Sequence, residues 1–311
     1  MNHLNPQVKK YLDAFYQMPS IHRMDPNKAR TMLAQFPRSN ENLDQLTKVE
    51  DCLVSVGENE EIKLRIYTPK GKGVFPIFVY YHGGGWVLGD LESADPVCRM
   101  IASRIGVLVV SVDYRLAPQY PFPIPAEDSY KALQWVKENG TAINGDINRI
   151  VVGGDSAGGN LAAAVSMMAS DRNGPHIAAQ VLVYPVTSFC FNTKSYHEFA
   201  NGFGLERDLM IWFSKHYLRN EEDKKNSYAN LLAANDLSML PSSLIITAEK
   251  DVLRDEGKEF SERLDKVGVR VDYICVPEMI HGYFTNFAFF SEQIENSLSY
   301  IGSFLEDLEL I

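Results

Sequence analysis

The sequence predicts an α/β fold: a mostly parallel sheet of about eight strands, with helices on both faces and a helical cap. Three observations predict it. Short apolar runs alternate with helix-like stretches along most of the chain, which is the pattern of β-α-β units. Most of these runs are apolar without interruption, as expected for strands buried on both faces. The chain has 311 residues, 45% of them hydrophobic, which is enough for one such domain with a large core.

Two short helices are expected at the N-terminus. Asn5-Pro6 and Asp25-Pro26 each place an N-cap residue before a first-turn proline, and apolar residues follow each pair at helical spacing. Neither helix fits the alternation of strands and helices. We therefore assign residues 1–45 to the cap.

Eight strand-like runs follow. The first two alternate apolar and polar residues, which favours an antiparallel hairpin at the edge of the sheet. The later runs are almost continuously apolar and are typical of parallel strands. The expected strands lie at about residues 52–57, 61–68, 75–81, 106–113, 149–153, 179–184, 243–248 and 270–276. The expected helices lie at about residues 93–104, 126–139, 157–170, 254–267 and 285–307.

Residues 190–235 interrupt this alternation. They contain no clear strand, and they include the charged run Glu221–Lys225 and the apolar run Leu209–Phe213. Long insertions in such folds are usually lids over a functional site. We therefore expect a single domain, with a cap from 1–45 and 190–235 and a catalytic body from 46–189 and 236–311.

The composition argues against several function classes. The net charge of −10 disfavours binding to nucleic acid or to an anionic membrane, because both need clustered Lys and Arg. No apolar run approaches about 18 residues, so stable membrane insertion is not expected. The four cysteines form no C-x-x-C pair, and we expect reduced thiols and a cytoplasmic location.

The most informative motif is Gly154-Asp155-Ser156-Ala157-Gly158. It follows the apolar run Ile150–Val152 and precedes a helix-like stretch, so its context is strand, sharp turn, helix. Flanking glycines allow a turn tight enough to project the serine hydroxyl. A serine hydroxyl is a poor nucleophile until a base takes its proton. The motif therefore requires a histidine, a carboxylate and donors for an oxyanion elsewhere in the chain.

The chain supplies all three. The loop His82-Gly83-Gly84-Gly85-Trp86 follows a strand-like run, and we expect the N–H groups of Gly83, Gly84 and Ala157 to form the oxyanion hole. Downstream, Asp251 and His281 each lie just past an apolar run. Groups beyond the carboxyl ends of parallel strands converge at one edge of the sheet. The order serine, aspartate, histidine is that of an α/β-hydrolase.

The chain resembles the hormone-sensitive-lipase-like carboxylesterases, bacterial family IV of the α/β-hydrolases. The resemblance rests on the motifs above and, between them, on Asp113-Tyr114-Arg115-Leu116-Ala117-Pro118, Tyr184-Pro185 and Leu253-Arg254-Asp255-Glu256. It implies an α/β-hydrolase fold with Ser156, Asp251 and His281 as the catalytic triad. It also implies hydrolysis of short- to medium-chain esters without cofactor or metal. Gln119, Val252 and the pair Glu249-Lys250 depart from the family pattern.

The expected partner is therefore a small ester. Apolar residues of the loop and cap are assigned to its pocket, namely Trp86, Met210, Trp212 and Phe213, although simple packing of the cap is an equally good interpretation. No nucleic acid is expected, and a homodimer stays open.

Several alternatives accompany this interpretation. Asp255 is the local rival of Asp251 as the residue that orients the histidine. The order His82, Asp113, Ser156 is that of chymotrypsin-like proteases, but the β-α-β pattern argues against two β-barrels. A non-catalytic receptor on the same fold would typically lack part of the triad. An amidase or peptidase would use the same triad.

Overall fold

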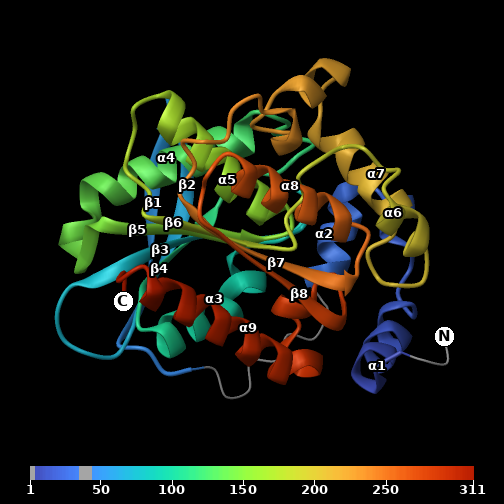
Figure 1. The fold of residues 1–311 in the computed structure, drawn as a ribbon, viewed down its shortest axis with the longest axis horizontal. Coiled ribbons are helices and arrows are strands. Elements are labelled where there is room, and N and C mark those ends of the chain that lie inside the picture. The colour runs from blue at the N-terminus through green and yellow to red at the C-terminus, as the bar shows by residue number, and fades with distance from the viewer. Residues whose placement is uncertain (1–3, 35–43) are drawn as a thin grey trace.

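The computed structural model describes residues 4–34 and 44–311, which contain one eight-stranded sheet (Figure 1). The strand order is β1-β2-β4-β3-β5-β6-β7-β8. Strand β2 runs antiparallel to β1 and β4, and all other neighbours are parallel. The strands are β1 (Lys48–Gly57), β2 (Glu60–Thr68), β3 (Phe75–Tyr81), β4 (Leu108–Asp113), β5 (Gly145–Asp155), β6 (Ala179–Val183), β7 (Ser242–Lys250) and β8 (Val271–Ile280). This arrangement confirms the predicted α/β class and the edge hairpin.

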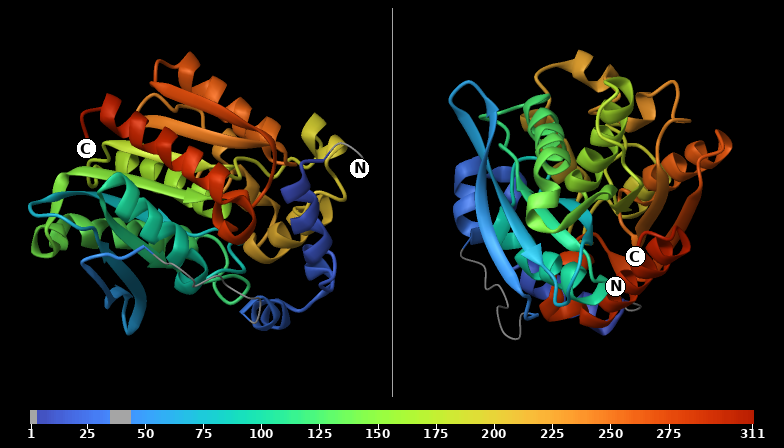
Figure 2. Two further views of the ribbon diagram at one scale, coloured as in Figure 1. Left: turned by 90° about the horizontal axis from the view of Figure 1, so that it is seen from below. Right: turned by 90° about the vertical axis from the view of Figure 1, so that its left-hand side faces the viewer.

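Helices cover both faces of the sheet. Helices α3 and α9 lie against one face and α4, α5 and α8 against the other (Figures 1 and 2). The helices are α1 (Pro6–Phe15), α2 (Pro26–Ala34), α3 (Leu91–Ile105), α4 (Ile124–Asn139), α5 (Ala157–Asp171), α6 (Lys194–Glu198), α7 (Arg207–Tyr217), α8 (Arg254–Lys266) and α9 (Phe287–Asp307). Short 3-10 helices are η1 (Ile21–Arg23), η2 (Gly140–Ile143), η3 (Glu221–Lys225), η4 (Leu231–Ala233) and η5 (Tyr283–Thr285). None of the helices in the described ranges has the length and apolar character needed to cross a bilayer.

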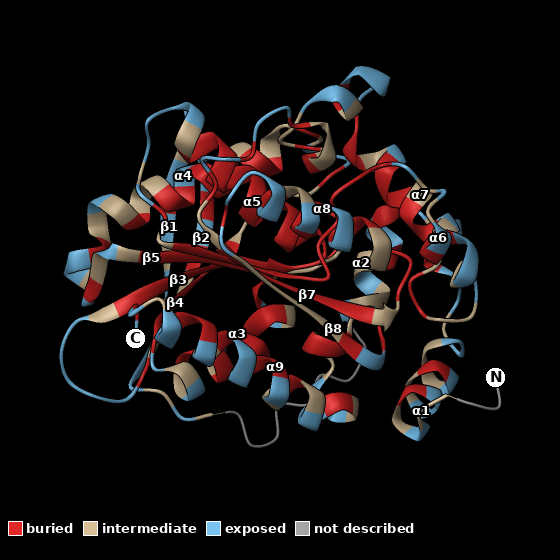
Figure 3. Ribbon diagram, viewed as in Figure 1, coloured by how far each residue is buried: buried red, intermediate tan, exposed pale blue. Residues whose placement is uncertain are grey.

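The middle of the sheet is the core. Strands β3 to β7 are almost entirely buried, because helices cover both of their faces (Figure 3). Helix α5 crosses this core and is buried along nearly its whole length. The elements that follow the central strands are therefore held on a rigid base.

Three strand boundaries differ from the prediction by four residues. Strand β5 begins at Gly145 and not at 149, because Gly145 pairs with Phe75 of β3. Strand β1 begins at Lys48, four residues before the apolar alternation starts, because Lys48 pairs in register with Thr68 of β2. Strand β8 continues to Ile280 because, after a register shift, Ile280 pairs with Lys250 of β7. This extension carries the chain directly to His281.

Helices α1, α2, α6 and α7, which belong to the two segments assigned to the cap, lie at the same end of the sheet, beyond the carboxyl ends of the parallel strands (Figures 1 and 2). Helix α1 begins after Asn5, whose side chain accepts the N–H of Gln7. The Tyr16 hydroxyl donates to Oε1 of Glu206 at 2.8 Å, which connects the N-terminal segment with the second segment. Parts of the proposed cap, residues 1–3 and 35–43, lie outside the described residues, and the division into cap and body stays a prediction.

Candidate active site

Ser156 lies in the sharp turn between β5 and α5. Its φ is 56° and its ψ −119°, a conformation that is strained for any residue with a Cβ atom. Gly154 and Gly158 approach the carbonyl oxygen of Tyr81 so closely that a Cβ at either position would overlap it. The N–H of Ser156 donates to the carbonyl of Val183 at 2.8 Å, which ties the turn to the end of β6. The turn therefore needs its flanking glycines for close packing.

Three side chains from three strand ends form one hydrogen-bonded chain. His281 Nε2 lies 2.9 Å from Ser156 Oγ, and His281 Nδ1 lies 2.7 Å from Asp251 Oδ2. A carboxylate only accepts hydrogen bonds, so Nδ1 carries the proton and Nε2 is left to accept the serine hydroxyl. The other Asp251 oxygen accepts the N–H of Leu253 at 3.0 Å, and the carboxylate is fully enclosed.

Asp255 makes no hydrogen bond to Ser156, His281 or Asp251 among the described contacts. Its Oδ2 accepts the N–H of Ser195 at 2.7 Å and its Oδ1 accepts from Arg254 Nε at 2.8 Å. Burial opposes ionisation of Asp255, but the hydrogen bonds from Arg254 and Ser195 hold its pKa below the ordinary value. The residue therefore joins the start of α8 to α6. The structure brings Asp251, rather than its local rival, to the histidine.

The glycine loop after β3 differs from the expectation at one position. Gly83 N–H donates to Asp155 Oδ1 at 2.9 Å, so it is not available to a substrate oxygen. In the described part of the chain, nothing accepts the N–H of Gly84 or Gly85. Ala157 is the first residue of α5, and its N–H has no acceptor within the helix. The expectation for Gly83 is therefore wrong, and the free donors belong to Gly84, Gly85 and Ala157.

The sequence gives no signal that selects two donors from three consecutive glycines. The selection follows from the backbone path, because φ is 113° at Gly84 and 61° at both Gly85 and Trp86. Such positive values are easily reached by glycine. They turn the chain sharply, and we name residues 84–86 the oxyanion turn.

His82 contacts the backbone of the loop directly before this turn and holds it in place. Its Nδ1 lies 2.7 Å from the Gly83 carbonyl oxygen. Its ring stacks on Tyr114, with centroids 4.3 Å apart and planes at 14°. The Tyr114 hydroxyl also donates to the His82 carbonyl at 2.7 Å. These contacts give His82 a scaffolding position outside the hydrogen-bonded chain of Ser156.

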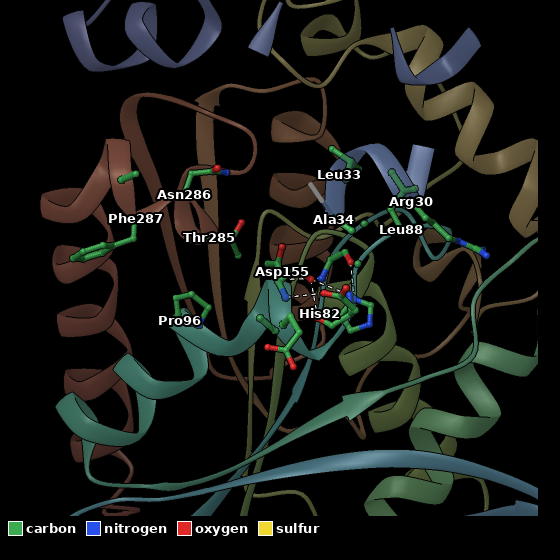
Figure 4. A pocket seen from close by; sticks show the side chains of 18 of the residues that line it. Arg30, Leu33, Ala34, His82, Leu88, Pro96, Asp155, Thr285, Asn286 and Phe287 are labelled. Atoms are coloured by element: carbon green, nitrogen blue, oxygen red, sulfur yellow. Dashed lines mark hydrogen bonds between the residues drawn. The ribbon is translucent and has the colours of Figure 1, made fainter. Parts of the chain in front are cut away.

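A cavity of about 720 Å³ opens beside Gly83, Gly84 and Asp155 (Figure 4). It reaches the start of α3 and the start of α9, and α1 and α2 also contribute to its walls. Its lining is mainly apolar and includes Phe15, Leu33, Leu88, Pro96, Phe287 and Phe289.

The four residues assigned to a pocket from sequence do not line this cavity. Trp86 is buried and stacks on Tyr217 of α7, with ring centroids 4.1 Å apart and planes at 3°. Phe213 packs so closely on Gly85 that a Cβ there would overlap its ring. Met210 and Trp212 are buried in the same core cluster. The aromatic face of α7 therefore packs against the oxyanion turn, and the open space lies elsewhere.

One buried acid near the site, Glu256, is part of the motif Leu253-Arg254-Asp255-Glu256, but the sequence analysis assigns it no role. Glu256 is fully buried at the start of α8, and its Oε1 accepts the N–H groups of Thr187 and Ser188 at 2.8 and 3.1 Å. Burial raises its pKa well above the ordinary value. The side chain thus anchors the segment after β6, whose Val186 N–H in turn donates to the Ser156 carbonyl at 3.2 Å.

Comparison with known proteins agrees with this geometry. A family model described as the alpha/beta hydrolase fold matches residues 78–285. The chain belongs to this α/β-hydrolase family. Among α/β-hydrolase relatives, the chain is 39% identical to carboxylesterase NlhH of Mycobacterium tuberculosis over 92% of this chain and 90% of that protein. It is 32% identical to an arylesterase of Saccharolobus solfataricus over 90% and 92% of the two chains.

Solved α/β-hydrolase structures are also similar. A hyperthermophilic esterase from the archaeon Pyrobaculum calidifontis superposes with a TM-score of 0.90 at 37% identity and covers 99% of both chains. A fungal esterase from Rhizomucor miehei gives a TM-score of 0.92 at 34% identity, over 98% of this chain and 96% of that one. These findings confirm the resemblance to the hormone-sensitive-lipase-like carboxylesterases that the motifs indicate.

Proposed function

We propose that the chain is a serine carboxylesterase that hydrolyses short- to medium-chain esters through an acyl-enzyme. The observation that carries this proposal is the hydrogen-bonded chain from Ser156 through His281 to Asp251. Among the described residues, nothing accepts the N–H groups of Gly84 and Gly85 in the turn or that of Ala157 next to Ser156.

The reaction begins at Ser156. His281 Nε2 takes the hydroxyl proton as Oγ attacks the ester carbonyl carbon. Asp251 holds Nδ1 in the protonated form and stabilises the imidazolium that results. His281 then gives its proton to the leaving alcohol as the C–O bond breaks. A water molecule, deprotonated by the same nitrogen, attacks the acyl-enzyme and releases the acid.

The N–H groups of Gly84, Gly85 and Ala157 are the proposed donors to the oxyanion. Ala157 lies at the N-terminus of α5, where the helix dipole also favours negative charge. Donors fixed in place before the reaction need no reorganisation when the charge develops. Their contribution is therefore larger in the transition state than in the bound ester.

We assign the cavity beside the oxyanion turn to the acyl portion of the ester. The leaving oxygen has to face His281 Nε2, which places the alcohol on the side of the histidine. Gly84 lines the cavity, whereas neither His281 nor Ser156 does. Its volume of about 720 Å³ is within the range of ~300–1,000 Å³ of ligand pockets.

The test is hydrolysis of p-nitrophenyl butyrate by the purified protein and by Ser156→Ala. We expect turnover by the wild type and none by the variant, with the same thermal unfolding midpoint. Turnover by both would remove Ser156 from the mechanism. A wild type without turnover would favour an amide substrate or a non-catalytic binding role. Hydrolysis of p-nitroanilide substrates would then indicate an amidase, and its absence a binding role. The homodimer, the absence of nucleic-acid binding and the cytoplasmic location stay predictions.

A further inference from the structure

Asp155 is a buried carboxyl group directly before the nucleophile, and the proposed reaction does not use it. Its Oδ1 accepts two hydrogen bonds, from the Tyr80 hydroxyl at 2.7 Å and from the Gly83 N–H at 2.9 Å. The residue is 6% exposed. One oxygen atom therefore joins β3, the end of β5 and the loop that leads into the oxyanion turn.

The Gly83 bond fixes the entry to the oxyanion turn. Gly83 immediately precedes Gly84, so the direction of the Gly84 N–H depends on how the Gly83 residue is held. The space between Gly83 and Asp155 is filled, because a Cβ at Gly83 would overlap the carboxyl group. The loop has little freedom to move towards Asp155 while that side chain is present.

The exit of the turn is fixed separately. The N–H groups of Val87 and Leu88 both donate to the Gly84 carbonyl, at 3.2 and 2.8 Å. The Gly84 carbonyl is thus held from one side, and the Gly83 N–H from the other. Removal of Asp155 would release only the second of these constraints, and it would also leave the contact between His82 Nδ1 and the Gly83 carbonyl in place.

We propose that Asp155 is a positioning residue of the oxyanion hole. Its Oδ1 acts as a hydrogen-bond acceptor that orients the Gly84 N–H towards the substrate oxygen. This inference rests on the proposed esterase function. It also explains why the Gly83 N–H is not an oxyanion donor: the Gly83 N–H aligns the next residue and leaves the oxyanion to Gly84, Gly85 and Ala157.

The acceptor, and not the charge, is the part of Asp155 that matters. A full negative charge next to the serine would oppose the developing oxyanion, and burial raises the pKa of this carboxyl group. An asparagine keeps the Oδ1 acceptor and nearly the same shape. Asp155→Asn and Asp155→Ala therefore separate the two roles.

The experiment compares kcat and KM for p-nitrophenyl butyrate, and the affinity of an alkyl trifluoromethyl ketone, in both variants. The ketone forms a hemiketal oxyanion with the serine and needs a formed oxyanion hole. Deleting one oxyanion donor costs about 10²–10³-fold in kcat. We expect Asp155→Ala, which displaces a donor without deleting it, to lower kcat and ketone affinity by about 10–100-fold with little change in KM. We expect Asp155→Asn to stay within about threefold of wild type.

Two controls separate positioning from general stability. Tyr80→Phe removes one donor to Oδ1 but leaves the Gly83 bond, so kcat should be retained while the unfolding midpoint falls. Asp128 is a buried carboxylate that holds Arg115 at 2.7 and 2.8 Å, outside the site. Asp128→Asn should likewise change stability without changing ketone affinity.

Two outcomes would overturn the proposal. In a folded Asp155→Ala protein, unchanged kcat and ketone affinity would leave Asp155 a merely structural role. An equal loss in Asp155→Asn would show that the charge acts instead of the acceptor. If Asp155→Ala does not fold, the double variant Tyr80→Phe/Asp155→Leu is used instead. It replaces the hydrogen-bonded pair of Tyr80 and Asp155 by apolar groups, and its kcat and ketone affinity are compared with those of the wild type in the same way. A wild type that fails to hydrolyse the ester would refute the proposed function instead, before any Asp155 variant is measured.

Discussion

Arg30 of α2 donates from Nε to the carbonyl oxygen of Val87 at 2.7 Å. Its Nη2 donates to the Ala117 carbonyl at 2.6 Å, and the Ala117 N–H donates to the Trp86 carbonyl at 2.9 Å. One guanidinium group from the N-terminal segment thus donates hydrogen bonds to carbonyl groups of two loops. One of these loops, at Val87, directly follows the oxyanion turn. The N-terminal segment and the turn are therefore physically connected.

Arg30→Met should weaken this connection. It removes the donors but keeps most of the apolar stem, and we expect a stability loss of about 1–3 kcal/mol for lost hydrogen bonds to a charged group. Because the turn loses an anchor, kcat for p-nitrophenyl butyrate should fall about tenfold. Denaturant unfolding and steady-state kinetics measure the two effects. Lys28→Met, an exposed position on the same helix, is the matched control. An Arg30→Met protein with normal kcat would show that the turn is held without α2.

Asp251→Asn should lower kcat by up to ~10⁴-fold, the size of the corresponding effect in serine proteases. The amide can donate to Nδ1 and so favours the wrong imidazole tautomer. Asp255→Asn should keep kcat within a few fold, since its partners are Ser195 and Arg254. Steady-state kinetics on both variants shows which of the two aspartates orients His281. A larger loss of kcat in Asp255→Asn than in Asp251→Asn would transfer the orienting role to Asp255.

Glu256 makes the stability of the protein depend on pH. Its pKa is raised in the folded state by burial, so folding retains a proton that the unfolded chain releases. The contribution of Glu256 to stability is therefore greatest below the ordinary glutamate pKa of about 4.3 and is lost as pH rises through the folded pKa. Glu256→Gln has no proton to release, and its unfolding free energy should fall less between pH 5 and 9.

Thermal unfolding over this pH range, with Glu262→Gln as the control on the same helix, measures this difference. Glu262 is largely exposed and pairs with Lys258. Parallel curves for wild type and Glu256→Gln would refute the buried-acid explanation.

Leu33→Trp should narrow the cavity beside the oxyanion turn, because Leu33 lines it from α2. We expect kcat/KM for p-nitrophenyl octanoate to fall about tenfold or more, while that for the acetate changes little. A series of acetates with longer alcohols should respond like p-nitrophenyl acetate. Leu53→Trp on the exposed face of β1 is the control. A selective loss in the alcohol series would reassign the cavity to the leaving group.

Much of the fold could be predicted because it depends on local patterns. Continuous apolar runs identify strands that are buried on both faces, and such strands in β-α-β order are parallel. Their carboxyl ends then bring Ser156, Asp251 and His281 to one edge. The family motifs narrow the choice of residues further. These inferences need no knowledge of which side chains contact one another.

The sequence predictions were wrong where contacts between distant parts of the chain determine the structure. Three consecutive glycines look alike in the sequence, and only the contact with Asp155 excludes the Gly83 N–H. The end of β8 depends on a register shift against β7. Met210, Trp212 and Phe213 of α7 suggest a pocket because they are large and apolar, but all three are buried in the core, and Phe213 packs on Gly85. Aromatic composition cannot distinguish a packed interface from a cavity wall.

The stacking of Trp86 on Tyr217 gives the protein a built-in optical probe. The chain has three tryptophans, Trp86, Trp135 and Trp212. Trp86 lies in the oxyanion turn and stacks on Tyr217, Trp212 lies on α7 with its ring against His216, and Trp135 lies on α4. In a Trp135→Phe/Trp212→Phe protein, the remaining emission comes from Trp86 alone. The emission maximum and the quenching of this fluorescence by acrylamide therefore report whether α7 stays packed against the oxyanion turn. The measurement runs in real time and needs no attached dye.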